Sequence, residues 1–442
     1  MAFFFRVCTF NIVRSIRDAL LSLWGRLPFM ARETLRQSGG LNAIVIGVLL
    51  LTCGLLNAQV PLLAEPPQLA VVEPKVSKAN YTTFDQIDVL VADQIKAKKL
   101  PGAVVAIGFG GQVVFLHAYG QRQLQPTQET MTIDTVFDVA SLTKPIATAT
   151  SIMQLVEQGK IALDDPVSKH LPDFAANEKA SVTIKQLLLH TGGLIPDNSL
   201  DDYASGHDEA IRKVMHIKLS YPPGDDFRYS DVGFIVLGEL IEKVSGEDLN
   251  SFTQKNIFSR LKLADTTYLP GEALRLRAAT TEQRDGHWMK GEVHDPRAFA
   301  VGGVAGHAGL FSTASDLAVY AQTLLNQGEG NGTQILQPAT ITEMTNAYPV
   351  PRGIRGLGWD KQSGYSSNRG KTMSARAFGH GGFTGTGLWI DPELDLFVIF
   401  LSNRVHPDGT GLVNPLIGQI GTVAADFARE ALDKTAAFES PR

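Results

Sequence analysis

Runs rich in β-forming residues stand near both ends of this chain, and a long middle section lacks them. Residues 103–109 and 113–119 flank Gly110-Gly111, a spacing that predicts a hairpin. Three more β-rich runs follow late in the chain, at 375–379, 385–390 and 396–402. Strands need partners for their backbone groups, so we expect both ends of the chain to contribute to one antiparallel sheet.

The middle section, from 164 to about 290, carries short apolar patterns at helical spacing that are broken by Gly and Pro. These patterns predict helices at 183–189, 208–215, 232–244 and 249–260. Outside this section we expect helices at 81–99, 145–157, 315–326 and 418–434. The predicted fold class is therefore α+β, an antiparallel sheet flanked by helices (81–163 and 295–434) plus an all-helical subdomain (164–294).

The first 58 residues differ from the rest of the chain. Residues 41–56 are apolar and follow Arg32 and Arg36, which is typical of a secretory signal peptide or of an N-terminal membrane anchor. Residues 59–80 have the composition of a linker, which leaves 81–434 as the folded domain. We therefore expect an exported protein that is periplasmic or extracellular. If the N-terminal segment is not cleaved, we expect it to hold the protein at the membrane.

Composition excludes several classes of function. Both cysteines, Cys8 and Cys53, lie in the N-terminal segment, so the expected mature domain has no cysteine nucleophile, disulfide or cysteine-bound metal. The formal net charge of −5 offers no basic patch for nucleic acid. No His-Glu-x-x-His or comparable cluster is present, and we expect neither a metal nor a cofactor.

Ser141-Leu142-Thr143-Lys144 stands where an extended run, 135–140, gives way to a helical one. A serine at a helix start lies near unpaired backbone N–H groups and the positive end of the helix dipole. A lysine three residues later shares its helical face, where an unprotonated amine can take the serine proton during attack on a carbonyl. The alternative is a capping serine with a solvated lysine.

Two later motifs favour the catalytic interpretation. Tyr229-Ser230-Asp231 is preceded by Pro-Pro-Gly and followed by Val-Gly-Phe, and His380-Gly381-Gly382 stands at the start of a β-rich run. With these motifs and their flanking sequence, residues 80–430 resemble the superfamily of serine β-lactamases and penicillin-binding proteins. The chain looks most similar to the class C-like branch, which also holds esterases and DD-peptidases.

The resemblance implies roles for specific residues. Ser141 is the expected nucleophile, and Lys144 and Tyr229 share proton transfer, with the choice of base between them left open. The backbone N–H groups of Ser141 and Phe383 are expected to form the oxyanion hole. The expected substrate-binding residues are Asp231, His380, Gly381 and Gly382.

The chain departs from the pattern of this superfamily at two places. The second motif usually ends in Asn, where this chain has Asp231. A carboxylate cannot donate a hydrogen bond to a substrate carbonyl, and close to Lys144 it favours the ammonium form. The third motif is often Lys-Thr-Gly or His-Thr-Gly, so Gly381 lacks a hydroxyl that would contact a substrate carboxylate. Both departures argue against efficient β-lactam binding.

We therefore expect an exported serine hydrolase that acts through an acyl-serine on an amide, β-lactam or ester bond. The expected substrate is a peptidoglycan peptide or a small ester. The alternative is a non-hydrolytic or slowly acylating penicillin-binding or scaffold protein, since a fold does not decide a function. His294 and His307 either border the cleft or belong to plain loops, and His190 is expected to be structural.

Overall fold

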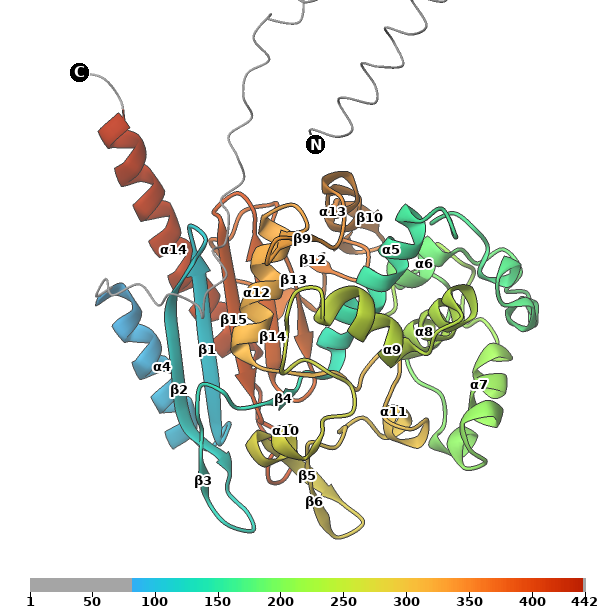
Figure 1. Ribbon diagram of the computed structural model, residues 1–442, viewed down its shortest axis with the longest axis horizontal. Coiled ribbons are helices and arrows are strands. Elements are labelled where there is room, and N and C mark those ends of the chain that lie inside the picture. Colours follow the sequence, from blue (N-terminus) through green and yellow to red (C-terminus); the bar gives the residue numbers. More distant parts are fainter. Residues whose placement is uncertain (1–81, 440–442) are drawn as a thin grey trace, which may run out of the picture. The chain divides into compact units, whose positions relative to one another are not determined.

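The computed structural model describes residues 82–439, which lie in one compact unit and contain a nine-stranded antiparallel sheet (Figure 1). The strand order is β10-β11-β12-β13-β14-β15-β1-β2-β3. The long central strands are β1 (Gly102–Phe109), β2 (Gln112–Gln123), β13 (Phe378–Gly382), β14 (Thr386–Asp391) and β15 (Leu396–Ser402). The predicted signal or anchor segment, 1–58, and the predicted linker to residue 80 lie outside the described residues.

Both ends of the described chain meet in this sheet. Strand β1 pairs antiparallel with β15, in a register that runs from Ala103↔Ser402 to Phe109↔Leu396. β1 also pairs with β2 across the Gly110-Gly111 turn. The antiparallel sheet predicted from the two sets of β-rich runs is thereby confirmed.

Shorter strands complete the architecture. At the edges of the large sheet lie β3 (Glu129–Thr130), β10 (Tyr348–Val350), β11 (Gly353–Arg355) and β12 (Asp360–Gln362). Three small pairs stand apart from it: β4 (Phe137–Asp138) with β7 (Phe311–Ser312), β5 (Thr280–Arg284) with β6 (His287–Lys290), and β8 (Glu329–Gly330) with β9 (Thr333–Gln334). Sequence patterning misses most of these strands because two or three residues carry no measurable periodicity.

The two faces of the sheet are buried against different layers. Along β15, Leu396, Val398 and Phe400 enter one apolar core, whereas the alternating residues Phe397, Ile399 and Leu401 enter the other. Successive side chains of a strand point to opposite faces, so a strand covered on both sides is apolar throughout. This explains why the run at 396–402 shows no polar alternation.

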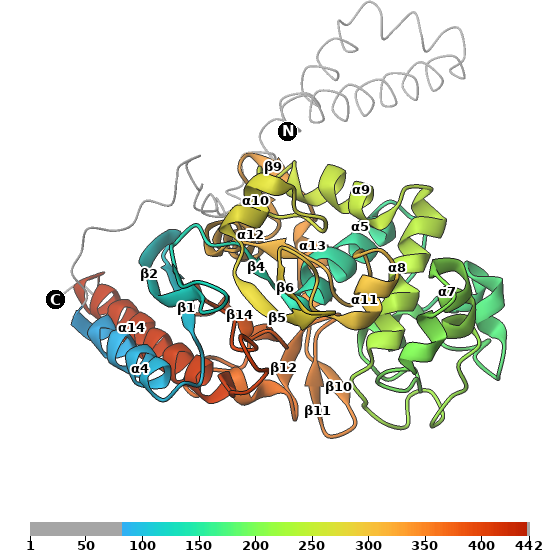
Figure 2. The same ribbon diagram turned by 90° about the horizontal axis from the view of Figure 1, so that it is seen from below.

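Helices form the two covering layers. On one face, α4 (Asp85–Lys96) and α14 (Asn414–Glu439) lie side by side (Figure 2). The other face carries α12 (Ala314–Leu325), beyond which α5 (Thr150–Glu157) packs on α8 (Asp231–Ser245). The remaining helices are α6 (Ile184–Leu188), α7 (His207–Met215), α9 (Leu249–Thr253), α10 (Glu272–Arg277), α11 (Pro296–Ala300) and α13 (Pro338–Thr345). None of the helices within 82–439 has the length and apolarity to cross a bilayer.

The section at 164–294 holds the predicted helices, but the expectation that it is all-helical is wrong. β5 and β6 form a hairpin within it, joined by Asp285-Gly286. Both turn residues have positive φ, 48° and 81°, which matches the turn geometry that Asp-Gly favours. The flanking strands are mostly polar, so neither shows the apolar alternation by which a strand is recognised.

Candidate active site

Ser141 lies in a sharp turn between β4 and the helix that follows. Residues Ala140–Leu142 form one turn of 3-10 helix, and Ala140 has a φ of 47°, which is unusual for a residue with a side chain. Asp138 Oδ1 accepts a hydrogen bond from the Ala140 N–H at 2.8 Å, and Thr143 Oγ1 donates to the Ala140 carbonyl at 2.6 Å. These contacts support a backbone conformation that presents Ser141 to solvent at the end of a buried strand.

Lys144 begins a π-helical segment, Lys144–Ala149, that runs into α5. Its side chain is fully buried, and Nζ donates to Ser141 Oγ at 3.1 Å and to the His307 carbonyl at 3.0 Å. The same ammonium forms an ion pair with Asp231 Oδ1 at 2.6 Å. The Ser-x-x-Lys spacing therefore does bring the two side chains together. Asp231 is the first residue of α8, which is far from Lys144 in the sequence.

The charge state of Lys144 follows from these neighbours. Burial disfavours the ammonium form, but Asp231 and Tyr229 together outweigh burial and hold the pKa of Lys144 above its ordinary value. Lys144 is therefore an ammonium ion at neutral pH in the unliganded site.

Tyr229 stands beside this ammonium. Lys144 Nζ lies 4.8 Å from the centre of the Tyr229 ring, which also stacks against His190 at 4.4 Å and Tyr365 at 5.0 Å. The phenolic oxygen is buried and faces Ser141 and Lys144, without a well-formed hydrogen bond to any of the described residues. Burial raises the pKa of Tyr229 despite the opposing attraction of Lys144, so the resting phenol is neutral and its oxygen is available to a reacting group.

The start of α8 fixes the second motif. Ser230 caps the helix by accepting from the Gly233 N–H at 3.1 Å, and its hydroxyl donates to the Ile195 carbonyl at 2.6 Å. The Ser230 N–H donates to His190 Nδ1 at 3.0 Å. His190 thus supports both Ser230 and the Tyr229 ring, which agrees with the structural role expected for it.

The third motif needs its two glycines for steric reasons. A Cβ on Gly381 would lie 2.6 Å from Asn368 Nδ2, and one on Gly382 would lie 2.5 Å from the Val139 carbonyl oxygen. Asn368 is buried and held by Trp389 Nε1, which donates to its Oδ1 at 3.2 Å. Asn368 therefore occupies the space beside Gly381 into which a side chain at that position would project.

His380 on β13 is buried, with its Nδ1 2.7 Å from the Gly381 carbonyl. Burial holds the pKa of His380 well below its ordinary value, and the positive charges of Arg355 and Lys144 act in the same direction. The imidazole is therefore neutral. Because a carbonyl can only accept, Nδ1 carries the proton and Nε2 is the acceptor.

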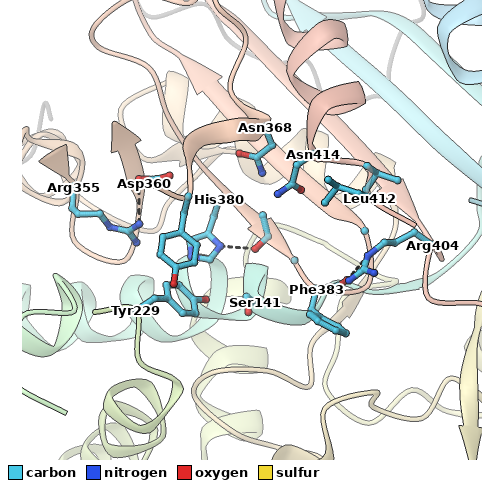
Figure 3. A pocket seen from close by; sticks show the side chains of 15 residues that line it. Ser141, Tyr229, Arg355, Asp360, Asn368, His380, Phe383, Arg404, Leu412 and Asn414 are labelled. Carbon is cyan, nitrogen blue, oxygen red and sulfur yellow. Dashed lines mark hydrogen bonds and ion pairs between the residues drawn. The ribbon is translucent and has the colours of Figure 1, made fainter. Parts of the chain in front are cut away.

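A pocket of about 290 Å³ opens above Ser141 and joins the motifs (Figure 3). Of the residues predicted from the sequence, Ser141, Tyr229, His380, Gly381, Gly382 and Phe383 line it, whereas Lys144 and Asp231 do not. Sequence reasoning missed its other lining residues, which belong to no motif: Arg355, Asp360, Tyr365, Asn368, Gly385, Arg404, Leu412, Val413 and Asn414. Only the fold brings these residues to the site.

Phe383, predicted as an oxyanion-hole residue, lies beside Ser141 at this pocket. Arg404 Nε donates to the Phe383 carbonyl at 2.9 Å, and the guanidinium lies over the Phe383 ring at 4.6 Å. The ring of His294 packs against Phe383 at 5.5 Å. His294 therefore borders the cleft through Phe383 rather than through direct contact with Ser141.

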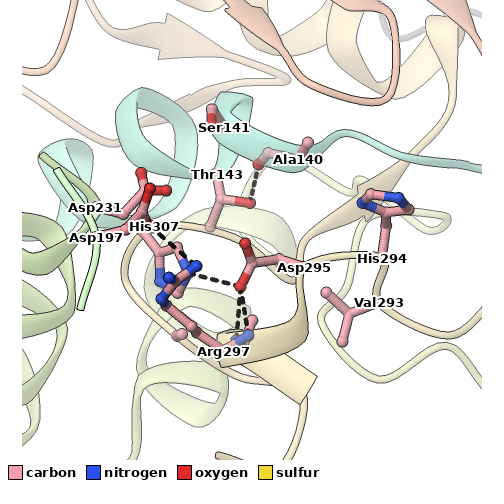
Figure 4. Close-up of polar contacts among 12 residues, drawn as sticks. Ala140, Ser141, Thr143, Asp197, Asp231, Val293, His294, Asp295, Arg297 and His307 are labelled. Atoms are coloured by element: carbon pink, nitrogen blue, oxygen red, sulfur yellow. Dashed lines mark hydrogen bonds and ion pairs between the residues drawn. The ribbon is translucent and has the colours of Figure 1, made fainter. Parts of the chain in front are cut away.

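A cluster of ionisable groups lies beside the turn that carries Ser141 (Figure 4). Asp231, Asp295 and His307 each have a ligand-type atom, all within 4.8 Å of one another, and His307 Nε2 lies 2.9 Å from Asp295 Oδ1. Asp295 also caps α11, accepting from the Arg297 N–H at 2.9 Å. A metal ion in this cluster would compete with the Lys144 ammonium, which is already paired with Asp231. Asp231 and its neighbours therefore suit the ammonium of Lys144 better than a metal ion.

Comparisons with known proteins identify relatives of this chain. A family model described as Beta-lactamase matches residues 87–421. The chain is 31% identical over 386 residues to the N-acetylmuramyl-L-alanine amidase of Bacillus subtilis (strain 168), an alignment that covers 78% of this chain and 87% of the relative. It is 30% identical over 400 residues to a D-alanyl-D-alanine carboxypeptidase-like protein of Escherichia coli (strain K12), covering 82% of this chain and 90% of the relative.

Two solved structures share the fold of this chain. EstCE1, a hydrolase with promiscuous acyltransferase activity, matches with a TM-score of 0.63 at 24% identity and covers 78% of this chain and 98% of its own. A class C beta-lactamase mutant matches with a TM-score of 0.65 at 18% identity, covering 78% of this chain and 97% of its own. At these identities the likeness concerns the fold alone.

Proposed function

We propose that this chain, a serine hydrolase of the beta-lactamase family, cleaves an amide bond in a peptidoglycan-derived peptide. We also propose that the protein is exported. One observation carries the proposal: Lys144 Nζ contacts Ser141 Oγ at 3.1 Å beneath an open pocket that also exposes Tyr229. The two curated relatives named above, an amidase and a carboxypeptidase-like protein, support an amide in a cell-wall peptide.

Acylation begins at Ser141. The Lys144 ammonium donates to Ser141 Oγ, so the serine's own proton points to another acceptor. The buried phenolic oxygen of Tyr229 faces Ser141, and as a phenolate it takes this proton while Oγ bonds to the substrate carbonyl carbon. The backbone N–H groups of Ser141 and Phe383 would stabilise the oxyanion.

The tetrahedral intermediate then collapses. The C–N bond breaks, the amine takes the proton held by Tyr229, and the acyl group remains on Ser141. A water molecule reverses these proton transfers and releases the carboxylic acid. Because the pKa of Tyr229 is raised, the phenolate is scarce at neutral pH, and acylation should accelerate as the pH rises.

The Asp231–Lys144 ion pair favours a second candidate, a protein that acylates slowly and acts as a binder. In that case an acyl adduct on Ser141 would form and persist without product release. In the first candidate, the adduct would turn over and peptide product would accumulate.

Intact-protein mass spectrometry tests both candidates, with a muropeptide, a fluorescent penicillin and p-nitrophenyl acetate as acyl donors. We expect a mass gain that disappears in Ser141→Ala. Ser259→Ala is a matched control, because Ser259 and Lys262 form a second Ser-x-x-Lys whose side chains are exposed. Loss of the adduct in Ser259→Ala, or its persistence in Ser141→Ala, would contradict the assignment.

Export needs its own experiment, because the N-terminal segment lies outside the described residues. N-terminal sequencing of protein recovered from the periplasm or the medium should find a start near residue 59. Protein found only in the cytoplasm would contradict export, and an intact N-terminus in the membrane fraction would indicate an anchor.

A further inference from the structure

A second cavity, of about 180 Å³, contains the buried lysine Lys361 in its lining. This Lys361 cavity lies between the end of α12, helix α13 and strands β12 and β13, and it shares no lining residue with the pocket above Ser141. The neighbours Asp360 and Lys361 on β12 line different cavities, Asp360 the pocket above Ser141 and Lys361 the second one. Successive side chains of a strand point to opposite faces, so one short strand contributes to both.

Lys361 holds a buried charge without a counter-charge. Its Nζ donates to the main-chain carbonyls of Thr345 at 3.1 Å and Arg376 at 3.0 Å, and it forms no ion pair with a residue in 82–439. An ammonium has three N–H donors, so one of them has no acceptor among the described residues. Carbonyls offer hydrogen bonds but no negative charge, and burying an unpaired ammonium is costly.

The charged groups around Lys361 do not supply the missing negative charge. Burial lowers the pKa of Lys361 to about 8, and the positive charges of Arg369 and Arg376 act in the same direction. Asp391 acts in the opposite direction, but its carboxylate already accepts from the N–H and the hydroxyl of Ser374, both at 2.6 Å. Lys361 is therefore mainly an ammonium ion at neutral pH, in surroundings that are positive on balance.

The lining of the Lys361 cavity combines positive charge with apolar surface. Lys361 and Arg376 line it, and no carboxylate of the described residues does. The exposed guanidinium of Arg376 forms no ion pair within 82–439. Leu324, Ile341 and Phe378 supply buried apolar walls. Small-molecule sites commonly have this composition, with apolar walls and a few polar groups that fix the orientation of the ligand.

We propose that the Lys361 cavity binds a small carboxylic acid with an apolar body. Its carboxylate pairs with Lys361 and Arg376, and its body packs on the apolar walls. A hydrated inorganic anion gains nothing from those walls, whereas an apolar body is stabilised when it leaves water. The inference does not depend on the proposed function, because neither cation lines the pocket above Ser141.

Isothermal titration calorimetry of the full chain compares benzoate with benzamide, which share an apolar ring and differ in charge. We expect benzoate to bind at least about tenfold more tightly than benzamide, as for a hydrogen bond between charged groups. Inorganic phosphate, an anion without an apolar body, should bind at least about tenfold more weakly than benzoate.

Proton uptake shows where the acid binds. A carboxylate favours the ammonium form of Lys361, so binding near pH 8, where part of Lys361 is neutral, should take up as much as about half a proton. Binding enthalpies in two buffers with different heats of ionisation measure this uptake, which should vanish at about pH 6 because Lys361 is then already protonated. Benzoate bound beside Arg355 and Arg404 would cause no uptake by those side chains, because guanidiniums stay protonated.

Lys361→Met should weaken benzoate binding at least about tenfold and abolish the proton uptake. Arg376→Met should also weaken benzoate binding, and because Arg376 is exposed it carries the comparison if Lys361→Met does not fold. The matched control is Lys179→Met. Lys179 is buried and donates to the carbonyls of Ala176 and Ile217, both at 2.6 Å, but it does not line the cavity. This control should change neither the affinity nor the uptake.

Circular dichroism and the thermal midpoint show which variants fold. Benzoate binding that is unchanged in the folded Lys361 and Arg376 variants would overturn the inference. Absence of saturable benzoate binding, or equal affinities for benzoate and benzamide, would overturn it as well. Phosphate that binds as tightly as benzoate would overturn the apolar body assigned to the ligand.

Discussion

Asp231 Oδ1 lies 2.6 Å from Lys144 Nζ, which makes the expected catalytic lysine one half of an ion pair. The contact joins two motifs that are far apart in the sequence, at the start of α8 and at the π-helical segment before α5. An amide at position 231 would leave Lys144 without this counter-charge. The identity of residue 231 therefore controls the protonation of the site as well as its hydrogen-bonding pattern.

Replacing Asp231 by Asn should make the site more basic at neutral pH. The Asp231 carboxylate raises the pKa of both Lys144 and Tyr229, so its removal lowers both. Whichever group is the base, its deprotonated form then appears at lower pH. We expect the rising limb of the pH profile for penicillin acylation to move toward acid and the rate at pH 7 to increase. A limb that stays in place or moves toward alkali contradicts the role given to Asp231.

Tyr229→Phe should separate catalysis from stability. The phenolic oxygen makes no well-formed hydrogen bond to the described residues, so its removal should leave the thermal midpoint nearly unchanged. Loss of a positioned acid–base group typically costs about 10²–10⁴-fold in rate. Stopped-flow acylation with the fluorescent penicillin measures this. An acylation rate within about twofold of the wild-type rate would assign the proton transfer to Lys144 alone.

Gly382→Ala should disturb the contact between β13 and the turn that carries Ser141. The new Cβ would lie 2.5 Å from the Val139 carbonyl oxygen and 2.1 Å from Thr386 Oγ1. Overpacking of this kind costs about 1–3 kcal/mol, and we also expect slower acylation because β13 must move away. Denaturant unfolding measures the loss. Gly271→Ala is the control, since a Cβ there meets nothing within 4 Å.

Asp295→Asn should reduce the acid sensitivity of the fold. Burial favours the protonated acid, but His307, the Ala298 N–H and Lys144 together outweigh burial and hold the pKa of Asp295 well below its ordinary value. A depressed pKa contributes stability that is present above the ordinary value, about 4, and is lost as the pH falls toward the folded-state value. Wild type should therefore be more stable at pH 7, and its advantage should shrink below about pH 4. Thermal midpoints of both proteins between neutral and acid pH test this, and a constant difference would contradict it.

The fold was largely predictable because its long elements carry their own signals. The β-rich runs at 103–109 and 396–402 correspond to β1 and β15, and the helical patterns at 232–244 and 315–326 correspond to α8 and α12. The hairpin of β5 and β6 was missed because its polar strands lack periodicity, although Asp285-Gly286 is a turn signal that could have found it.

The site was predictable only in part. Motif spacing placed Ser141 and Lys144 on one helical turn, and the resemblance supplied Tyr229 and His380. The Ser-x-x-Lys spacing alone does not identify a catalytic pair, because Ser259 and Lys262 have the same spacing and both side chains are exposed. Arg355 and Asn368 follow no motif, so no sequence signal pointed to them.

By itself, the sequence determined the long strands and helices and placed Ser141 and Lys144 on one helical face. Local spacing and periodicity suffice for these, since they depend on neighbours within a few residues. Only the tertiary structure decided that Asp231 neutralises Lys144, that the His307 carbonyl holds the same ammonium, and that Arg355 is fully buried beside Asp360. Such contacts join residues far apart in the chain, and their distances depend on how the sheet and its helices pack.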